Sequence, residues 1–214
     1  MLKCATSLWS ADLAHLAADI KRVEPYSDRF HIDVADGRYV DLLLFFPDLV
    51  SAIRPHTALP FEVHLIAYNP LRWVDAFIEA GADSFIFYFD ATDNPAAVIE
   101  AIKSRGKPVG MSLRLEDSVD VLEPYWDELS LVTLVGTHMG VKGAAMDESL
   151  PGKIRQARQI IDERGLQTEI QADGGIRRHT VPLIHAAGAD VIVPGSLMFK
   201  EDPAAIQAWL QMLD

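Results

Sequence analysis

Short apolar runs alternate along the chain with longer stretches in which apolar side chains recur at helical spacing. The apolar runs predict strands at residues 2–8, 30–34, 61–66, 84–89, 108–113, 131–135, 169–173 and 191–193. The stretches between them predict helices at residues 11–23, 47–54, 70–80, 95–103, 119–122, 152–164, 180–187 and 203–213. Ser10 is the expected N-cap of the first helix.

The regular alternation of strands and helices predicts the fold. Eight strands that alternate with eight helices imply a parallel sheet, and we predict an α/β fold, a (β/α)8 TIM barrel, in one domain spanning residues 1–214. The motif Ala-Gly-Ala-Asp occurs at residues 80–83 and 187–190, and each glycine is expected to end a helix. An open doubly wound sheet is the alternative. It is disfavoured because no early strand is followed by a G-x-G-x-x-G turn.

Polar side chains at the ends of three predicted strands indicate a metal site. His31 and Asp33 share one face of the second strand, Glu62 and His64 share one face of the third, and Asp173 ends the seventh. In a closed barrel the carboxyl ends of the strands surround one mouth, where active-site groups gather. His31, Asp33, His64 and Asp173 therefore predict a site for a divalent ion, with Zn²⁺ first and Mn²⁺, Fe²⁺ or Co²⁺ as alternatives. The competing interpretation is a histidine that a neighbouring carboxylate satisfies inside a polar barrel.

Glycine pairs follow the last two strands, where such barrels commonly bind phosphate. Gly174-Gly175 and Gly195-Ser196 offer N–H groups that a ligand can approach closely, and a hydroxyl. Each pair is also compatible with an ordinary turn, but together they predict a phosphate pocket.

Composition and charge narrow the range of partners. The formal net charge of −12 argues against nucleic acid and against an anionic membrane as the main partner, so we expect a small-molecule ligand. The single cysteine, Cys4, excludes an internal disulfide and is expected to be buried. No segment is long and apolar enough for a signal peptide or a membrane span, and we expect a cytoplasmic protein that forms a homo-oligomer.

Several short motifs, taken in chain order, resemble the ribulose-phosphate 3-epimerase family. The family's Ser-x-x-Ser-Ala-Asp, His-x-Asp-x-Met-Asp-Gly and Asp-x-His-Leu are matched by residues 7–12, 31–37 and 62–65. Its Asp-Gly-Gly and Gly-Ser are matched by residues 173–175 and 195–196. The match covers essentially the whole chain, and the joint pattern is specific although each motif is short.

The resemblance implies a function and roles for the residues. It implies a metal-dependent epimerase that inverts C3 of a ketose phosphate, such as ribulose 5-phosphate, xylulose 5-phosphate or a related pentulose, hexulose or tetrulose phosphate. The resemblance implies four metal ligands: His31, Asp33, His64 and Asp173. It also implies that Asp33 and Asp173 are the acid and base and that Ser7 contacts the substrate.

The chain departs from the family pattern around the substrate. Ala35 stands where the family has Met, and the histidine expected after the fourth strand is absent from residues 85–89. The family's loop Asn-Pro-Gly-Phe-Gly-Gly-Gln reads His-Met-Gly-Val-Lys-Gly-Ala at residues 138–144, where only Gly140 and Gly143 survive as expected substrate contacts. The reaction type is therefore better supported than the substrate.

Other functions remain compatible with these residues. A metal-dependent sugar-phosphate lyase or aldolase would use the same stabilised enediolate, and a non-catalytic sugar-phosphate binder would fit the altered loop. A Schiff-base aldolase needs a lysine at the mouth, and only Lys142 could reach it.

Overall fold

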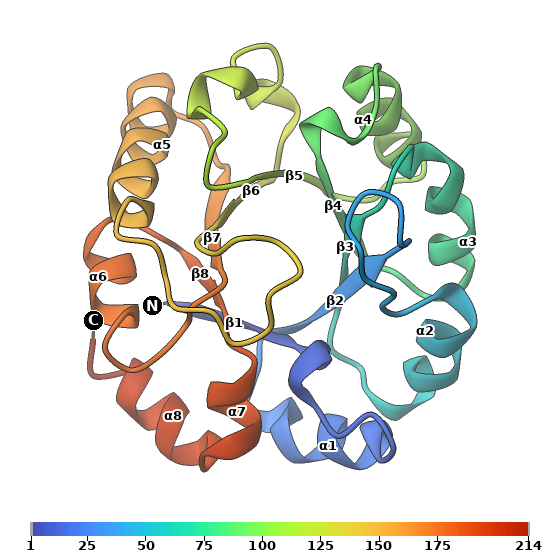
Figure 1. The fold of residues 1–214 in the computed structure, drawn as a ribbon, viewed down its shortest axis with the longest axis vertical. Helices are drawn as coiled ribbons and strands as arrows, with labels where there is room; N and C mark the ends of the chain where they lie inside the picture. The colour runs from blue at the N-terminus through green and yellow to red at the C-terminus, as the bar shows by residue number, and fades with distance from the viewer. Residues whose placement is uncertain (1, 214) are drawn as a thin grey trace.

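The computed structural model, which describes residues 2–213, is a closed barrel of eight parallel strands in chain order (Figure 1). Each strand pairs with its neighbours in the chain, and β8 closes the barrel against β1. The strands are β1 (Lys3–Ser7), β2 (Arg29–Ala35), β3 (Phe61–Ile66), β4 (Ser84–Tyr88), β5 (Val109–Leu113), β6 (Leu131–Val135), β7 (Glu169–Asp173) and β8 (Val191–Val193). The predicted TIM barrel is confirmed. Residues 1 and 214, the ends of the predicted domain, lie outside the described residues.

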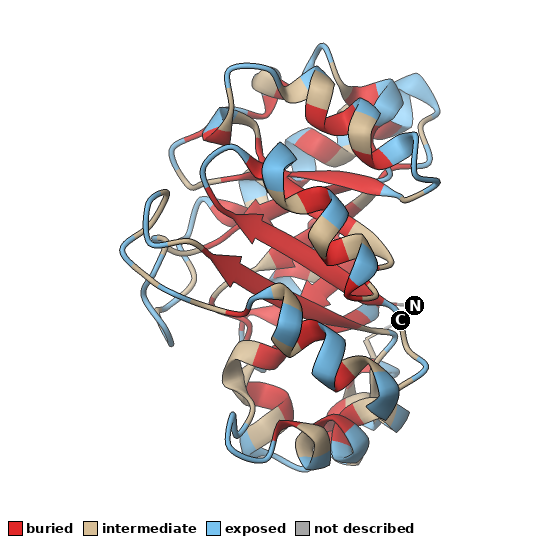
Figure 2. Ribbon diagram, turned by 90° about the vertical axis from the view of Figure 1, so that its right-hand side faces the viewer, coloured by how far each residue is buried: buried red, intermediate tan, exposed pale blue. Residues whose placement is uncertain are grey.

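Helices surround the barrel and cover the outer face of the sheet (Figure 1). They are α1 (Leu16–Val23), α2 (Pro47–Ile53), α3 (Val74–Glu79), α4 (Pro95–Lys103), α5 (Leu150–Arg164), α6 (Val181–Ala186), α7 (Ser196–Lys200) and α8 (Pro203–Leu210). Their buried faces meet buried strands, and their exposed faces point outward (Figure 2). Phe30, Ile32 and Val63 on the strands belong to the same buried cluster as Ile20 and Val50 on the helices. None of the helices within residues 2–213 combines the length and apolar character needed to cross a membrane.

Both ends of the chain lie at the end of the barrel opposite the carboxyl ends of the strands. In Figure 2 the arrowheads of the strands point toward long loops, and the N and C marks lie at the opposite end. The carboxyl ends of the strands, which carry the predicted site, therefore open beneath these loops.

The repeated Ala-Gly-Ala-Asp motif has the same role in both copies. Gly81 and Gly188 have φ of +101° and +104°, so each ends its helix in a conformation that favours glycine. The aspartates of the motif, Asp83 and Asp190, each accept a hydrogen bond of 2.8 Å from a backbone N–H of a neighbouring strand. The motif thus ends a helix and fixes the register of the strand beside it.

The first connection differs from the prediction. The chain leaves β1 in a 3-10 helix, Leu8–Ser10, and α1 begins only at Leu16, with His15 and not Ser10 as its N-cap. The Ser10 hydroxyl lies against Gly195, where a Cβ would collide with it. The segment after β1 therefore contributes Trp9 and Ser10 to the lining of the mouth before the helix starts.

The helix predicted at residues 119–122 is present as a 3-10 helix, Val119–Leu122. A second 3-10 helix, Trp126–Glu128, follows it, and Pro124 between them prevents one continuous helix. The short helix α7 was not predicted, since its five residues carry too little periodicity to be recognised. Cys4 is buried with 3% of its surface exposed, as predicted.

Candidate active site

Four side chains with metal-binding chemistry converge inside the mouth of the barrel. The pairing of β2 with β3 sets His31 beside Glu62 and Asp33 beside His64. Asp173 joins them from the end of β7. One ligand atom from each of His31, Asp33, His64 and Asp173 lies within 4.8 Å of all the others. The structure therefore brings together all four predicted ligands.

The spacing of these atoms suits a small divalent ion. Nε2 of His31 lies 3.2 Å from Nδ1 of His64, 3.4 Å from Oδ1 of Asp33 and 3.9 Å from Oδ2 of Asp173. Nδ1 of His64 lies 3.8 Å from Asp33 Oδ1 and 3.9 Å from Asp173 Oδ2. Zinc bonds of about 2.0–2.1 Å in a tetrahedron separate neighbouring ligand atoms by about 3.4 Å. The cluster is close to that spacing, so an ion fits with small side-chain shifts.

The two imidazoles present one nitrogen each to this cluster. His31 donates from Nδ1 to Oε1 of Glu62 at 2.9 Å, which turns Nε2 toward the other ligands. His64 faces the cluster with Nδ1 and stacks on Tyr88 with ring centroids 5.2 Å apart. Among the described residues Nε2 of His64 has no hydrogen-bond partner, so the ring is placed by packing and by the cluster.

A buried polar network beneath the cluster holds Glu62. Its Oε1 also accepts from Nε2 of Gln171 at 2.7 Å, and its Oε2 lies 2.9 Å from Nε of Arg29. Gln171 in turn accepts from the Thr133 hydroxyl at 2.8 Å. Glu62 is 1% exposed and is paired on both oxygens. A carboxylate that orients a metal-binding histidine in this way sets its tautomer and raises its basicity.

Sequence reasoning missed most of this network. Glu62 was recognised as sharing a face with His64, but Arg29 and Gln171 were not assigned a role. Gln171 precedes Asp173 by two positions on β7, so the alternation of a strand could have placed it on the inner face. Tyr88, which stacks on His64 at the end of β4, was also missed because aromatic residues in strands usually belong to the apolar core.

The two aspartates of the cluster have pKa values displaced in opposite directions. Burial raises the pKa of Asp173 to about 7, and the Asp33 charge adds to this effect although the His31 ring opposes it. Burial acts the same way on Asp33, but His31, His64 and the Ser7 hydroxyl together hold its pKa below the usual value. In the metal-free chain near neutral pH, Asp33 is therefore an ionised base and Asp173 is poised to hold a proton.

The pKa values of the two imidazoles are also displaced in opposite directions. Burial lowers the pKa of His31, but Asp33 and Glu62 outweigh it and bring the net pKa well above the usual value. Burial, with the neighbouring His31, lowers the pKa of His64 to about 3. His64 is thus neutral at physiological pH, as a metal ligand must be, while His31 must release a proton when an ion binds.

A cavity of about 670 Å³ opens above the cluster and is large enough for a small sugar phosphate. Its lining includes Asp33, His64 and Asp173 together with every predicted substrate contact: Ser7, Gly140, Gly143, Gly174, Gly175, Gly195 and Ser196. The glycines are sterically required at two points. A Cβ on Gly175 would collide with the backbone of Met146, and a Cβ on Gly195 with Ser10. The structure therefore places three of the four predicted metal ligands, all except His31, and the predicted phosphate residues around one cavity.

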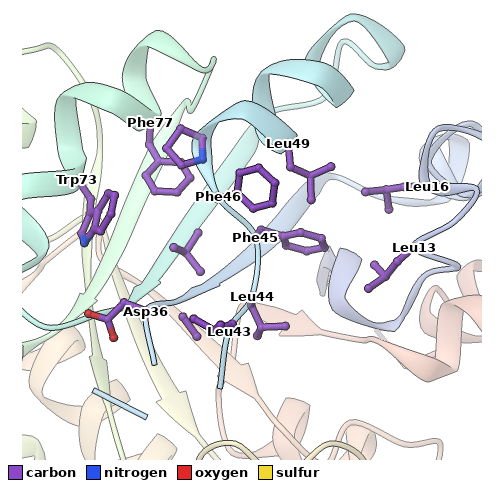
Figure 3. A pocket seen from close by; sticks show the side chains of 13 residues that line it. Leu13, Leu16, Asp36, Leu43, Leu44, Phe45, Phe46, Leu49, Trp73 and Phe77 are labelled. Atoms are coloured by element: carbon purple, nitrogen blue, oxygen red, sulfur yellow. The ribbon is translucent and has the colours of Figure 1, made fainter. Parts of the chain in front are cut away.

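A second cavity, of about 550 Å³, is apolar and lies apart from this chemistry (Figure 3). Leu13, Leu43, Phe46 and Trp73 are among its lining residues, with Asp36 as the charged one. The Asp36 carboxylate accepts from backbone N–H groups, two in its own turn and one at Tyr68, so its role is structural. None of the metal-ligand candidates lines this cavity.

Comparison with known proteins matches nearly the whole chain to one family. The model of the ribulose-phosphate 3 epimerase family matches residues 3–199. The ribulose-phosphate 3-epimerase of Bacillus subtilis (strain 168) is 38% identical over 203 residues, covering 94% of each chain. That of Chlamydia pneumoniae is 33% identical over 210 residues, covering 97% of this chain and 92% of the relative.

Solved structures of more distant proteins share the fold. KGPDC from Streptococcus mutans, crystallised as a ligand complex, superposes with a TM-score of 0.78 at 14% identity, covering 99% of this chain and 97% of that one. The 3-hexulose-6-phosphate synthase from Salmonella typhimurium gives a TM-score of 0.71 at 19% identity, covering 99% and 98%. At these identities the likeness concerns the fold alone.

Proposed function

The chain belongs to the ribulose-phosphate 3-epimerase family, and we therefore propose that it inverts C3 of a ketose phosphate, with ribulose 5-phosphate and xylulose 5-phosphate as the first candidates. It is an isomerase, a carbohydrate epimerase. The observation that carries the proposal is a pair of carboxylates, Asp33 and Asp173, that line one cavity from β2 and β7.

The two carboxylates match the needs of the reaction. Inversion beside a ketone requires a base that removes the C3 proton from one face and an acid that returns a proton to the other. Asp33 takes the proton, the electron pair moves into an enediolate, and Asp173 delivers a proton to the opposite face from Oδ1, because its Oδ2 faces His31 and His64. In the reverse direction the two residues exchange roles. Strands β1 and β8 lie between β2 and β7 in the barrel, so the carboxyls approach a substrate from separate sides.

The two oxygens of Asp33 have different neighbours. Oδ1 lies 3.4 Å from His31 and 3.8 Å from His64, whereas Oδ2 accepts a hydrogen bond of 2.7 Å from the Ser7 hydroxyl. This division leaves Oδ1 for a bound ion and Oδ2 for the proton. Ser7 orients Oδ2 and is within reach of substrate.

The residues that would hold the ion are His31, Asp33, His64 and Asp173, and we propose Zn²⁺ first, with Mn²⁺, Fe²⁺ and Co²⁺ as alternatives. When bound, a divalent ion stabilises the negative charge of the enediolate as a Lewis acid. The chain itself positions the four ligands, excludes water from the buried side of the cluster and moves the proton.

The phosphate of the substrate is assigned to the loops after β7 and β8. Gly174, Gly175, Gly195 and Ser196 line the cavity that contains both aspartates, and Gly140 and Gly143 lie across it on the loop after β6. A cytoplasmic location and a homo-oligomeric state stay predictions.

A panel of ketose phosphates tests the proposal. The purified protein, loaded with Zn²⁺, is incubated with pentulose, hexulose and tetrulose phosphates, and the products are identified by NMR. We expect inversion at C3 of at least one of them, with the carbon chain intact. Cleavage of the chain would indicate the metal-dependent lyase instead, and binding without turnover would indicate a sugar-phosphate binder.

A further inference from the structure

The loop between β6 and α5 lies across the mouth of the barrel (Figure 1). It contains the residues that depart from the family pattern, and Val141, Lys142 and Gly143 in it line the cavity. Two basic side chains tie the loop to its surroundings. Lys142 donates from Nζ to the backbone oxygen of Trp9 at 2.6 Å, and Arg177 donates from Nη2 to the backbone oxygen of Gly143 at 3.5 Å.

These two cations have neutral partners. Across the part of the chain that the structure describes, neither Lys142 nor Arg177 forms an ion pair with a carboxylate, and their hydrogen bonds go to backbone carbonyl oxygens. Other arginines behave differently: Arg158, for example, pairs with Asp190. In a chain of net charge −12, these two cations lie beside the cavity without neutralising acids among the described residues, as does Lys200 on α7.

Their anchor points lie next to the proposed phosphate loops. Lys142 bonds to Trp9, whose neighbour Ser10 packs against Gly195 after β8. Arg177 comes two residues after Gly175 on the loop after β7. One cation thus adjoins each glycine pair, and the acidic groups that line the cavity, Asp33 and Asp173, belong to the cluster on its floor.

We propose that Lys142 and Arg177 form a two-cation subsite for the phosphate of the substrate, beyond the backbone contacts of the glycine loops. The inference rests on the proposed function for the identity of the sugar, but the subsite itself is a claim about a phosphate dianion. Hydrogen bonds between charged groups are roughly twice as strong as neutral ones, so an arriving phosphate competes well with the carbonyl partners. The loop then closes over the anion through its own lysine, and the substrate class is a sugar that carries a dianionic phosphate.

Charge-removing variants test the subsite. Lys142→Met and Arg177→Met remove the charge and keep an unbranched apolar stem. The matched control is Arg178→Met, because Arg178 is adjacent in sequence but pairs with Glu201 outside the cavity. Isothermal titration with inorganic phosphate measures binding directly and needs no turnover. Each test variant is expected to bind phosphate about tenfold more weakly than wild type, and the control to bind it unchanged.

The second measurement is steady-state kinetics with the ketose phosphate that the enzyme is found to turn over. We expect KM to rise about tenfold in each test variant while kcat changes little, and Lys142→Arg to restore KM. Raising the salt concentration should weaken phosphate binding in wild type and have a smaller effect in the double variant, in which Lys200 still lines the cavity. The proposal would be overturned by wild-type phosphate affinity in both test variants, or by a fall in kcat at unchanged KM. Lys142 and Arg177 would then only hold the loop in place. If no ketose phosphate is turned over, the proposed function fails, but the phosphate titration still decides the subsite.

Discussion

Replacing Glu62 by Gln tests whether the buried network beneath the cluster controls metal binding. Glu62 accepts from His31 and Gln171 on one oxygen and pairs with Arg29 through the other. Glutamine keeps the shape, and its oxygen can still accept from His31. Its amide group replaces the charged oxygen that faces Arg29, so the variant removes charge without opening a cavity.

Two effects of this change can be separated by size. Loss of a carboxylate behind a metal-binding histidine lowers metal affinity about 10- to 100-fold, or about 1.4–2.7 kcal/mol. Breaking a buried ion pair can cost about 3–5 kcal/mol of folding stability. Arg29 is 20% exposed and keeps Glu169 at 3.2 Å, so it is not left unpaired. We therefore expect the smaller stability loss of a buried hydrogen bond, about 1–3 kcal/mol, beside the full loss in metal affinity.

Zn²⁺ affinity is measured by competition with a chromophoric chelator at neutral pH. Folding stability is measured by denaturant unfolding of the metal-free protein. Glu169→Gln is the matched control, because Glu169 contacts Arg29 and Lys3 at the other end of the barrel but not His31. The control should lose little stability and bind Zn²⁺ as wild type does. Wild-type Zn²⁺ affinity in Glu62→Gln, with stability reduced, would show that Glu62 supports the fold and has no part in metal binding.

The cluster and the phosphate loops carry four more predictions. His64→Ala should lose bound metal while the fold survives, and metal analysis with circular dichroism checks both; full occupancy would remove His64 from the site. Zn²⁺ affinity should fall as pH drops, because protons on His31, whose pKa is raised, and on Asp173, whose pKa is about 7, compete with the ion. Since that pKa is raised from 3.8, Asp173 stabilises the metal-free fold at low pH, and this contribution is lost as pH rises from about 4 through 7. Denaturant unfolding should therefore show metal-free Asp173→Asn gaining stability relative to wild type over that interval, and a constant difference would contradict the raised pKa. Gly195→Asp should bind ketose phosphates much more weakly and lose the preference for phosphorylated over unphosphorylated sugars, and an unchanged preference would place the phosphate elsewhere.

The barrel and the metal cluster could be predicted because both follow from short-range rules. Strand alternation places His31 and Asp33 on one face, and in a parallel barrel the strand ends meet at one mouth whatever the loops do. The same rules placed Gly174 and Gly195 after the last strands. These predictions needed no knowledge of which side chains touch.

Contacts across the barrel could not be predicted in this way. Arg29 reaches Glu62 on the next strand and Glu169 on β7, and neither partner is implied by its own segment. The late start of α1 has a similar cause, because Ser10 packs against Gly195 from the far end of the chain. The ties of Lys142 and Arg177 to carbonyl oxygens also join segments that are distant in sequence, so only the folded structure shows them.

Incorporation of solvent deuterium during turnover is the decisive test of the two-aspartate reaction. The Zn²⁺-loaded enzyme is incubated in D₂O with the ketose phosphate that it turns over, ribulose 5-phosphate first, and the product is read by NMR. We expect an inverted C3 that carries deuterium, and loss of inversion in both Asp33→Asn and Asp173→Asn. An inverted product that retains the original hydrogen, or inversion at near wild-type rate in either variant, would rule out proton transfer by this pair of carboxylates.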